Sequence, residues 1–183
     1  MRSSFSLVSS SFALIVLIFF SHGVNGIDLV RGTCKRVAKT NPKLYYPFCV
    51  RSFGANIRSK TADLAGLGII STDLAISNAK FIKLYAKNML KDQQKGDGGK
   101  ALQDCLEVFT DAIPQLNEVK QAFLSKDYST ANIKMSAAMD ASSTCEDGLK
   151  EKNITVPSFT KKNEEFSQLA AITLAITNLV NNP

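Results

Sequence analysis

Hydrophobic positions recur along this chain at alternating spacings of three and four residues, and no stretch alternates with the period of two that a half-buried strand requires. Four segments carry the pattern. In each segment the positions with this spacing fall on one side of the expected helix, which we call its seam. The seam positions are Leu64, Leu67, Ser71, Leu74, Asn78, Phe81 and Tyr85; Leu102, Cys105, Phe109, Ala112, Leu116, Val119 and Phe123; Tyr128, Ala131, Met135, Ala138, Ser142, Cys145 and Leu149; and Phe166, Leu169, Thr173, Ile176 and Val180. The pattern predicts an all-α protein in which residues 61–183 form an antiparallel four-helix bundle.

Polar residues between these segments predict where the helices begin and end. A short loop, Lys-Gly-Asp-Gly-Gly at 95–99, is predicted to separate the first two bundle helices, and Val-Pro-Ser at 156–158 the last two. Pro114 lies inside the second segment, where a kink is expected rather than a break. The candidate N-caps are Thr61, Asp127 and Thr160.

The segment before the bundle, residues 27–60, is predicted to be a small helical hairpin divided at Asn41-Pro42. It carries eight basic residues and a single acid, Asp28, which gives a net charge of +7. Such a segment could contact an acidic polysaccharide, which an exported protein meets more readily than nucleic acid. The alternative is that the charges only keep two short helices solvated. The bases are Arg31, Lys35, Arg36, Lys39, Lys43, Arg51, Arg58 and Lys60.

The first 26 residues are predicted to be a signal peptide. Arg2 precedes an apolar run over 12–20, and a small-residue cleavage site, Val-Asn-Gly, follows at 24–26. The apolar run is about half of the roughly 20 residues that a membrane span needs. We therefore expect the mature chain to start at Ile27, to be secreted, and to keep no membrane anchor.

The composition of the expected mature chain argues against most enzymes. The only histidine, His22, lies in the predicted signal peptide, and the chain contains no tryptophan. Without an imidazole, Ser-His and Cys-His nucleophile systems and histidine metal sites are excluded. If the cysteines are paired, no thiolate remains for nucleophilic or zinc chemistry. We therefore expect a protein that is not an enzyme and has neither a metal nor a cofactor.

Four cysteines allow three disulfide connectivities, and helix geometry selects one of them. Cys105 and Cys145 occupy seam positions, each 20 residues from the turn expected near Ser125, so they lie at the same level of two antiparallel helices. Cys34 and Cys49 flank the Asn41-Pro42 turn in the same way. We therefore predict the pairs Cys34–Cys49 and Cys105–Cys145, typical of an exported protein.

Several stretches resemble the plant invertase and pectin methylesterase inhibitors. These are Asp-Leu-Ala-Gly-Leu-Gly at 63–68 with Asp-Leu-Ala at 73–75, Asp-Tyr at 127–128, and Thr-Cys-Glu-Asp at 144–147. The 14-residue gap between Cys34 and Cys49 is similar to that of the plane-tree pollen allergen branch, whose members are described as invertase inhibitors. The resemblance implies a rigid bundle that docks on a cell-wall carbohydrate enzyme and blocks its substrate.

The resemblance leaves two target enzymes open. Invertase inhibitors begin the third bundle helix with Pro-Lys-Phe, where this chain has Tyr128, Ser129 and Thr130. Pectin methylesterase inhibitors begin it with Gly-Asp-Tyr, close to the Lys-Asp-Tyr at 126–128, and Thr144 matches their contact region. These local residues, including Asp127, favour pectin methylesterase slightly, whereas the likeness of the whole chain favours acid invertase. A non-inhibitory module that binds acidic polysaccharide is a further alternative.

Two exposed stripes and one sequon complete the candidate features. An acidic stripe on the second bundle helix could complement a basic enzyme surface, or it could be a solvated face. A lysine stripe on the first bundle helix is expected to keep that side in water. Asn153 begins an Asn-Ile-Thr sequon in the loop after the third helix, a candidate for N-glycosylation. The acidic stripe is Asp104, Glu107, Asp111 and Glu118, and the lysine stripe is Lys80, Lys83, Lys87 and Lys91.

Overall fold

The structure is a computed structural model that describes residues 26–92 and 97–181, and nearly all of the predicted signal peptide lies outside these residues. Within the described ranges the chain is helical and contains no strand, as the sequence pattern predicts. The elements are α2 (Gly26–Thr40), α3 (Tyr46–Gly54), the 3₁₀ turn η1 (Ile57–Lys60), α4 (Leu64–Asp92), α5 (Asp97–Leu124), α6 (Tyr128–Glu151) and α7 (Pro157–Asn181).

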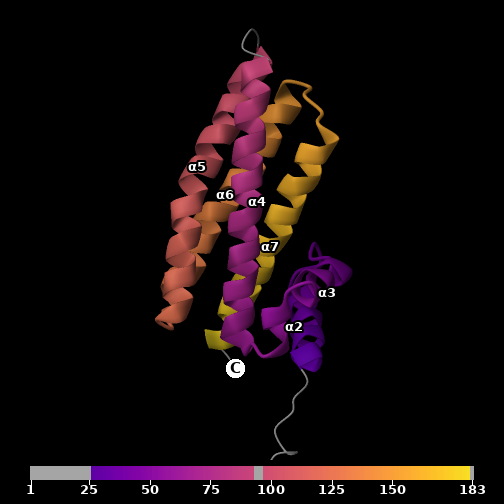
Figure 1. The fold of residues 1–183 in the computed structure, drawn as a ribbon, viewed down its shortest axis with the longest axis vertical. Coiled ribbons are helices and arrows are strands. Elements are labelled where there is room, and N and C mark those ends of the chain that lie inside the picture. The colour runs from indigo at the N-terminus through magenta and orange to yellow at the C-terminus, as the bar shows by residue number, and fades with distance from the viewer. Residues whose placement is uncertain (1–25, 93–96, 182–183) are drawn as a thin grey trace, which may run out of the picture.

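The four long helices form a square bundle in which each packs on two neighbours. α4 lies between α5 and α7, and α6 completes the square opposite α4. The hairpin of α2 and α3 packs against α4 and α7 only, beside one end of the bundle (Figure 1). The α5–α6 side of the bundle is therefore remote from the hairpin.

The predicted seams of α5 and α6 form the core. All seven seam residues of α5 are buried, including Phe109, whose ring meets Phe166 of α7 edge-on with centroids 5.1 Å apart. On α6 the seam is buried from Ala131 to Leu149, and only Tyr128 at its start is half-buried. The spacing of apolar residues on these two helices was therefore sufficient to predict the core.

The predicted seam of α4 is wrong beyond its first turns. Phe81 is 42 % exposed and Asn78 is half-buried, whereas Ala75, Ala79 and Ile82 are fully buried. A strict spacing of 3.5 residues drifts by about 20° per heptad against a straight helix. In addition, the small side chains of Ala75 and Ala79 allow neighbouring helices to pack closely against them. The bulky ring of Phe81 therefore lies at the edge of the seam.

Two helix starts also differ from prediction. α4 is capped by Asp63, whose Oδ1 accepts the backbone N–H of Gly66 at 2.7 Å, and not by Thr61. α7 begins at Pro157, three residues before the predicted cap Thr160. Proline suits the first helical position because its missing N–H has no partner there in any case.

Three residues of the loop predicted between α4 and α5 are helical. Asp97, Gly98 and Gly99 belong to the first turn of α5 rather than to a loop, and residues 95–96 lie outside the described ranges. α5 continues through Pro114 without a break. The kink expected at this proline stays a prediction.

Both predicted disulfides are formed. Cys34–Cys49 joins α2 to α3 with a Cα–Cα distance of 5.7 Å, and Cys105–Cys145 joins α5 to α6 at 4.6 Å. No described cysteine is free. Each disulfide thus closes one antiparallel helix pair at matching levels.

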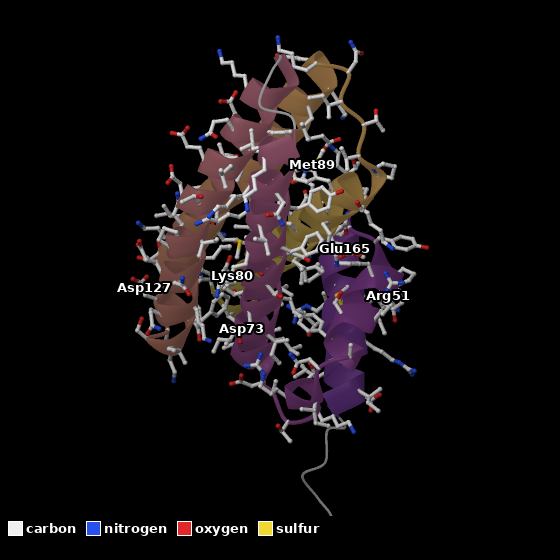
Figure 2. The ribbon with its side chains drawn as sticks, turned by 45° about the horizontal axis from the view of Figure 1, so that its top comes forward. Arg51, Asp73, Lys80, Met89, Asp127 and Glu165 are labelled. Atoms are coloured by element: carbon white, nitrogen blue, oxygen red, sulfur yellow. A yellow bond between two sulfur atoms is a disulfide. The ribbon has the colours of Figure 1, made fainter. Side chains whose placement is uncertain are left out.

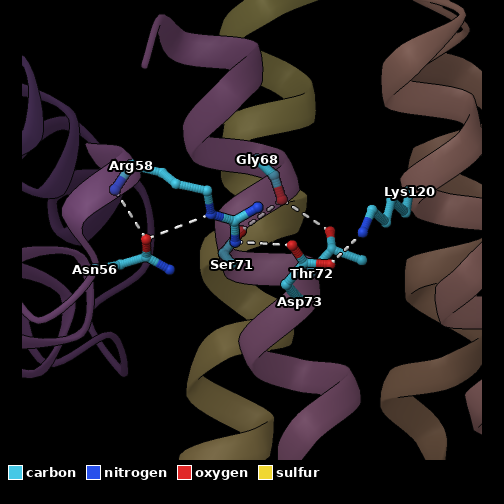
Figure 3. Close-up of polar contacts among 7 residues, drawn as sticks. All are labelled: Asn56, Arg58, Gly68, Ser71, Thr72, Asp73 and Lys120. Atoms are coloured by element: carbon cyan, nitrogen blue, oxygen red, sulfur yellow. Dashed lines mark hydrogen bonds and ion pairs between the residues drawn. The ribbon is translucent and has the colours of Figure 1, made fainter. Parts of the chain in front are cut away.

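Polar contacts attach the hairpin to the bundle at two places. Arg58 of η1 forms an ion pair with Asp73 of α4 at 2.8 Å, and Asp73 also pairs with Lys120 of α5 at 2.8 Å (Figure 3). At the second place, Gln168 of α7 accepts the backbone N–H of Tyr45 and donates to the carbonyl of Lys43. The hairpin is therefore fixed to α4 and α7, and Asp73 joins the first of these contacts to α5.

Candidate functional site

The turn between α5 and α6 is closed by its own backbone. Lys126 adopts a left-handed conformation with φ 60°, and the N–H of Asp127 donates to the carbonyl of Ala122 at 2.8 Å. The N–H of Lys126 donates to Phe123, which completes a Schellman motif at the end of α5. The turn therefore fixes where α6 begins.

Asp127 is the N-cap of α6, as predicted. Its Oδ1 accepts the backbone N–H of Thr130 at 3.0 Å. Hydrogen bonds from the side chain and then the backbone of Thr130 lower the pKa of the Asp127 carboxyl. The helix start therefore carries a negative charge at neutral pH and in mildly acidic solution alike.

The three residues after the cap differ in exposure. Tyr128 is half-buried, and its ring meets that of Phe123 at a centroid distance of 5.8 Å. Ser129 is exposed and Thr130 half-buried. Of these residues, Ser129 is the most accessible to a partner, while the packing of Tyr128 orients the helix start.

A groove between α5 and α6 brings two predicted interface residues together. Asp111 of α5 and Thr144 of α6, which are 33 positions apart in sequence, line the same groove of about 170 Å³. Both side chains are exposed. We refer to this groove, lined by Val108, Asp111, Ala112, Gln115, Ala137, Asp140, Ala141 and Thr144, as the α5–α6 groove.

The acidic stripe continues the polar wall of this groove. Asp104 and Glu107 are exposed on α5, two turns and one turn before Asp111. None of these three forms an ion pair with a described residue, whereas Glu118 pairs with Lys134 of α6 at 2.7 Å. Three of the four predicted acids are therefore available to a partner.

The predicted interface residues do not form one compact patch. Asp127 and Thr144 are separated by 17 residues of α6, which is about 25 Å along the helix axis. The Glu118–Lys134 ion pair lies between them on the same side of the bundle. A partner could therefore contact the start of α6, the α5–α6 groove, or both by covering this whole side.

Two polar residues of the groove, Gln115 and Asp140, are not among the residues predicted from the sequence. Each lies one helical turn from a residue that was predicted, since Gln115 follows Asp111 by four positions and Asp140 precedes Thr144 by four. Helical spacing from the predicted positions could have found them.

Asn153 occupies a second Schellman turn, at the end of α6. It has φ 53°, and the N–H of Ile154 donates to the carbonyl of Leu149 at 2.9 Å. Asn153 and Thr155 are both exposed. The predicted sequon is therefore accessible, and its glycosylation stays a prediction.

Within the described residues there is no group of three potential metal-ligating side chains, and no helix is long and apolar enough to cross a membrane. The features that the fold presents are an exposed helical side with a shallow polar groove and a disulfide-closed hairpin. A rigid, disulfide-closed surface of this kind suits binding to another macromolecule.

Comparison with known proteins identifies the family. The chain belongs to the plant invertase/pectin methylesterase inhibitors, whose family model matches residues 28–176. This is a family of enzyme inhibitors. A provisionally named invertase inhibitor of Platanus acerifolia is 46 % identical over 98 % of this chain and 99 % of its own length. Pectinesterase inhibitor 12 of Arabidopsis thaliana is 35 % identical over 91 % of this chain and 98 % of its own length.

A solved structure agrees with the fold. The crystal structure of a mutant form of a pectin methylesterase inhibitor from Arabidopsis superposes with a TM-score of 0.69 and covers 78 % of this chain and 95 % of its own. The two sequences are 22 % identical, so the likeness supports the helical architecture alone.

Proposed function

We propose that this protein is a secreted inhibitor of pectin methylesterase in the plant cell wall, and that it docks through the side of the bundle formed by α5 and α6. The observation that carries the proposal is the α5–α6 groove, because it joins Asp111 and Thr144 in one exposed site. The unpaired acids Asp104 and Glu107 extend this site along α5 and would complement a basic enzyme surface.

Binding rather than catalysis fits the chemistry of this side. Residues 27–183 contain no histidine, and the described cysteines are disulfide-bonded. The groove, at about 170 Å³, is smaller than the roughly 300 to 1,000 Å³ of a small-molecule pocket. We therefore propose that the protein is not itself an enzyme and that a macromolecular surface covers the groove.

Acid invertase is the second candidate target. It is favoured by the 46 % identity to the Platanus acerifolia relative, which extends over nearly the whole of both chains. A protein of this type would dock by the start of α6, where Ser129 is exposed beside the fixed charge of Asp127. The two candidates thus predict contacts at positions about 20 Å or more apart on α6.

A side-by-side assay distinguishes the two targets. Purified protein with both disulfides intact is titrated against one pectin methylesterase and one acid invertase. We expect concentration-dependent inhibition of the esterase. Inhibition of the invertase alone would establish the second candidate, and inhibition of neither enzyme would reject both.

Three matched substitutions locate the contact. Thr144→Lys places a long cation in the groove and should weaken esterase inhibition at least about tenfold, which corresponds to about 1.4 kcal/mol of binding free energy. Ser129→Lys places a long cation at the start of α6 and should weaken inhibition of invertase instead of the esterase. Thr160→Lys, on the exposed surface of α7, is the control and should change neither. Undiminished esterase inhibition by Thr144→Lys would exclude the groove.

The pH dependence of inhibition gives an independent test. With no imidazole in residues 27–183, any change in affinity between about pH 4 and 6 must come from carboxylates of this chain or from the enzyme. Replacing Asp104, Glu107 and Asp111 by their amides should flatten that profile if the acidic stripe contacts the target. An unchanged profile would assign the titrating groups to the enzyme.

A further inference from the structure

The hairpin carries a second surface whose chemistry differs from that of the α5–α6 groove. Four basic residues of α2, Arg31, Lys35, Arg36 and Lys39, are all exposed, and we call them the basic ridge. We propose that the basic ridge binds a linear carboxylated polysaccharide, and that it does so independently of enzyme inhibition.

Helix geometry gathers these four charges on one side of α2. At 100° per residue, Arg31, Lys35, Lys39 and Arg36 fall within an arc of about 140°. The residues that α2 buries, Val30, Thr33, Cys34 and Val37, occupy the opposite arc and face the rest of the protein. The only acid in the hairpin, Asp28, lies at the N-terminal end of the same outward arc.

The charges of the basic ridge are not neutralised by the protein. None of its four residues forms an ion pair with a described acid, although several other bases do. Arg58 of η1 pairs with Asp73, and Lys120, Lys134, Lys150 and Lys162 each have a carboxylate partner. The ridge is therefore a concentrated positive surface that lacks counter-charges of its own, which favours a polyanion.

The surroundings of the ridge favour a soluble polyanion over a lipid surface. A helix that lies in a membrane interface inserts an apolar face beneath its basic residues. Here the apolar face of α2 is already buried, and Cys34 on that face is joined to Cys49 of α3. A flexible chain with carboxylates along its length can instead follow the ridge for about 12 Å, the rise from Arg31 to Lys39.

The position of the ridge allows both surfaces to work together. The hairpin packs on α4 and α7, whereas α5 is on the other side of the bundle (Figure 1). The α5–α6 groove is lined by residues of α5 and α6 alone. Figure 2 shows the same separation, with Asp127 and the hairpin residue Arg51 on opposite flanks. A protein held on polysaccharide through the ridge would keep its groove free, which raises its effective concentration near enzymes bound to the same matrix.

Binding of the full mature protein to polygalacturonate, measured by co-sedimentation or calorimetry at low and at physiological salt, tests the proposal. Lys35→Gln, Arg36→Gln and Lys39→Gln together remove three charges from the ridge. The control, Lys80→Gln, Lys87→Gln and Lys91→Gln, removes the same charge from exposed positions of α4. Glutamine keeps helix propensity nearly unchanged in both.

We expect the ridge variant to bind polygalacturonate on the order of 100-fold more weakly at low salt, from about fivefold per charge at an anionic surface. The control variant should bind within about threefold of the parent, and fully methyl-esterified pectin, which lacks the carboxylates, should not bind. Equal losses in both variants, or no binding of the parent at low salt, would overturn the proposal.

Binding to anionic phosphatidylserine vesicles but not to polygalacturonate would also overturn it, because it would assign the ridge to a membrane surface. The inhibition assays remain a separate readout. A ridge variant that still inhibits its enzyme but no longer binds polygalacturonate shows that the two surfaces are independent, whereas loss of inhibition in the ridge variant would contradict that independence.

Discussion

Gly68 of α4 offers a sharp test of how the bundle supports the start of α6. A Cβ added at Gly68 would lie 2.3 Å from Cε1 and 2.4 Å from Cζ of Phe123. Phe123 is 2 % exposed and its ring packs on Tyr128, so it has little room to withdraw. Gly68→Ala therefore forces a buried ring, and with it Tyr128, to shift.

The expected magnitude comes from two opposing effects. Alanine in a helix interior is favoured over glycine by about 0.9 kcal/mol. Overpacking a well-packed core costs typically about 1–3 kcal/mol, and contacts this short place Gly68→Ala in the upper half of that range. We expect the substitution to lower the free energy of unfolding by about 1–2 kcal/mol.

Urea denaturation followed by circular dichroism measures this change, and Gly32→Ala provides the control. Gly32 is exposed in the middle of α2 with no atom within 4 Å of the added Cβ, so its replacement should stabilise by up to about 1 kcal/mol. Adding Phe123→Leu to Gly68→Ala should recover part of the loss, which a double-mutant cycle reports. If Gly68→Ala were as stabilising as Gly32→Ala, the steric reasoning would be refuted.

Three further predictions concern charge, turn and disulfide. Burial raises the pKa of Asp73, but the hydrogen bonds and charges of Lys120 and Arg58 outweigh this effect and hold the pKa below the ordinary value of an aspartate. Asp73→Asn should therefore lower the free energy of unfolding by about 1 kcal/mol above pH 5. Urea titrations should show this difference becoming smaller as the pH falls below 4. Lys126→Gly should raise the unfolding free energy by about 1 kcal/mol, because glycine adopts φ 60° without strain; an unchanged thermal midpoint would contradict this. Replacing Cys105 and Cys145 by serine should lower the free energy of unfolding, measured by chemical denaturation, by about 4 kcal/mol. A decrease of less than about 1 kcal/mol would show that the disulfide is dispensable for stability.

The sequence predicted the fold well where one physical signal dominated. On α5 and α6 the apolar residues lie on a single stripe, so their spacing identified the core and the level of the Cys105–Cys145 disulfide. It failed on α4, where Ala79 and Phe81 compete for the seam and only packing against neighbouring helices decides between them. It also failed where several residues can start a helix. Asp63 rather than Thr61 caps α4 because its side chain accepts the backbone N–H of Gly66, a hydrogen bond that residue spacing alone does not show.

The sequence singled out residues on both walls of the α5–α6 groove but not their arrangement around it. Residues of the acidic stripe and Thr144 were found separately, and the register of α5 against α6 was needed to show that Asp111 and Thr144 share a groove. The rise along α6 places Asp127 about 25 Å from Thr144, too far for both to belong to one small contact. Gln115 and Asp140 were missed because nothing in their residue types distinguishes them from other polar helix positions.

The attachment of the hairpin through Gln168 has a consequence for how this protein can change over time. The side-chain amide of Gln168 bonds to the backbone of Lys43 and Tyr45 and not to their side chains. Main-chain groups are the same whichever amino acids occupy those two positions, provided that residue 45 is not proline. Substitutions at 43 and 45 can therefore alter the charge and shape of the hairpin without loosening its attachment. Descendants of this chain can acquire new hairpin surfaces while the α5–α6 side of the bundle is left untouched.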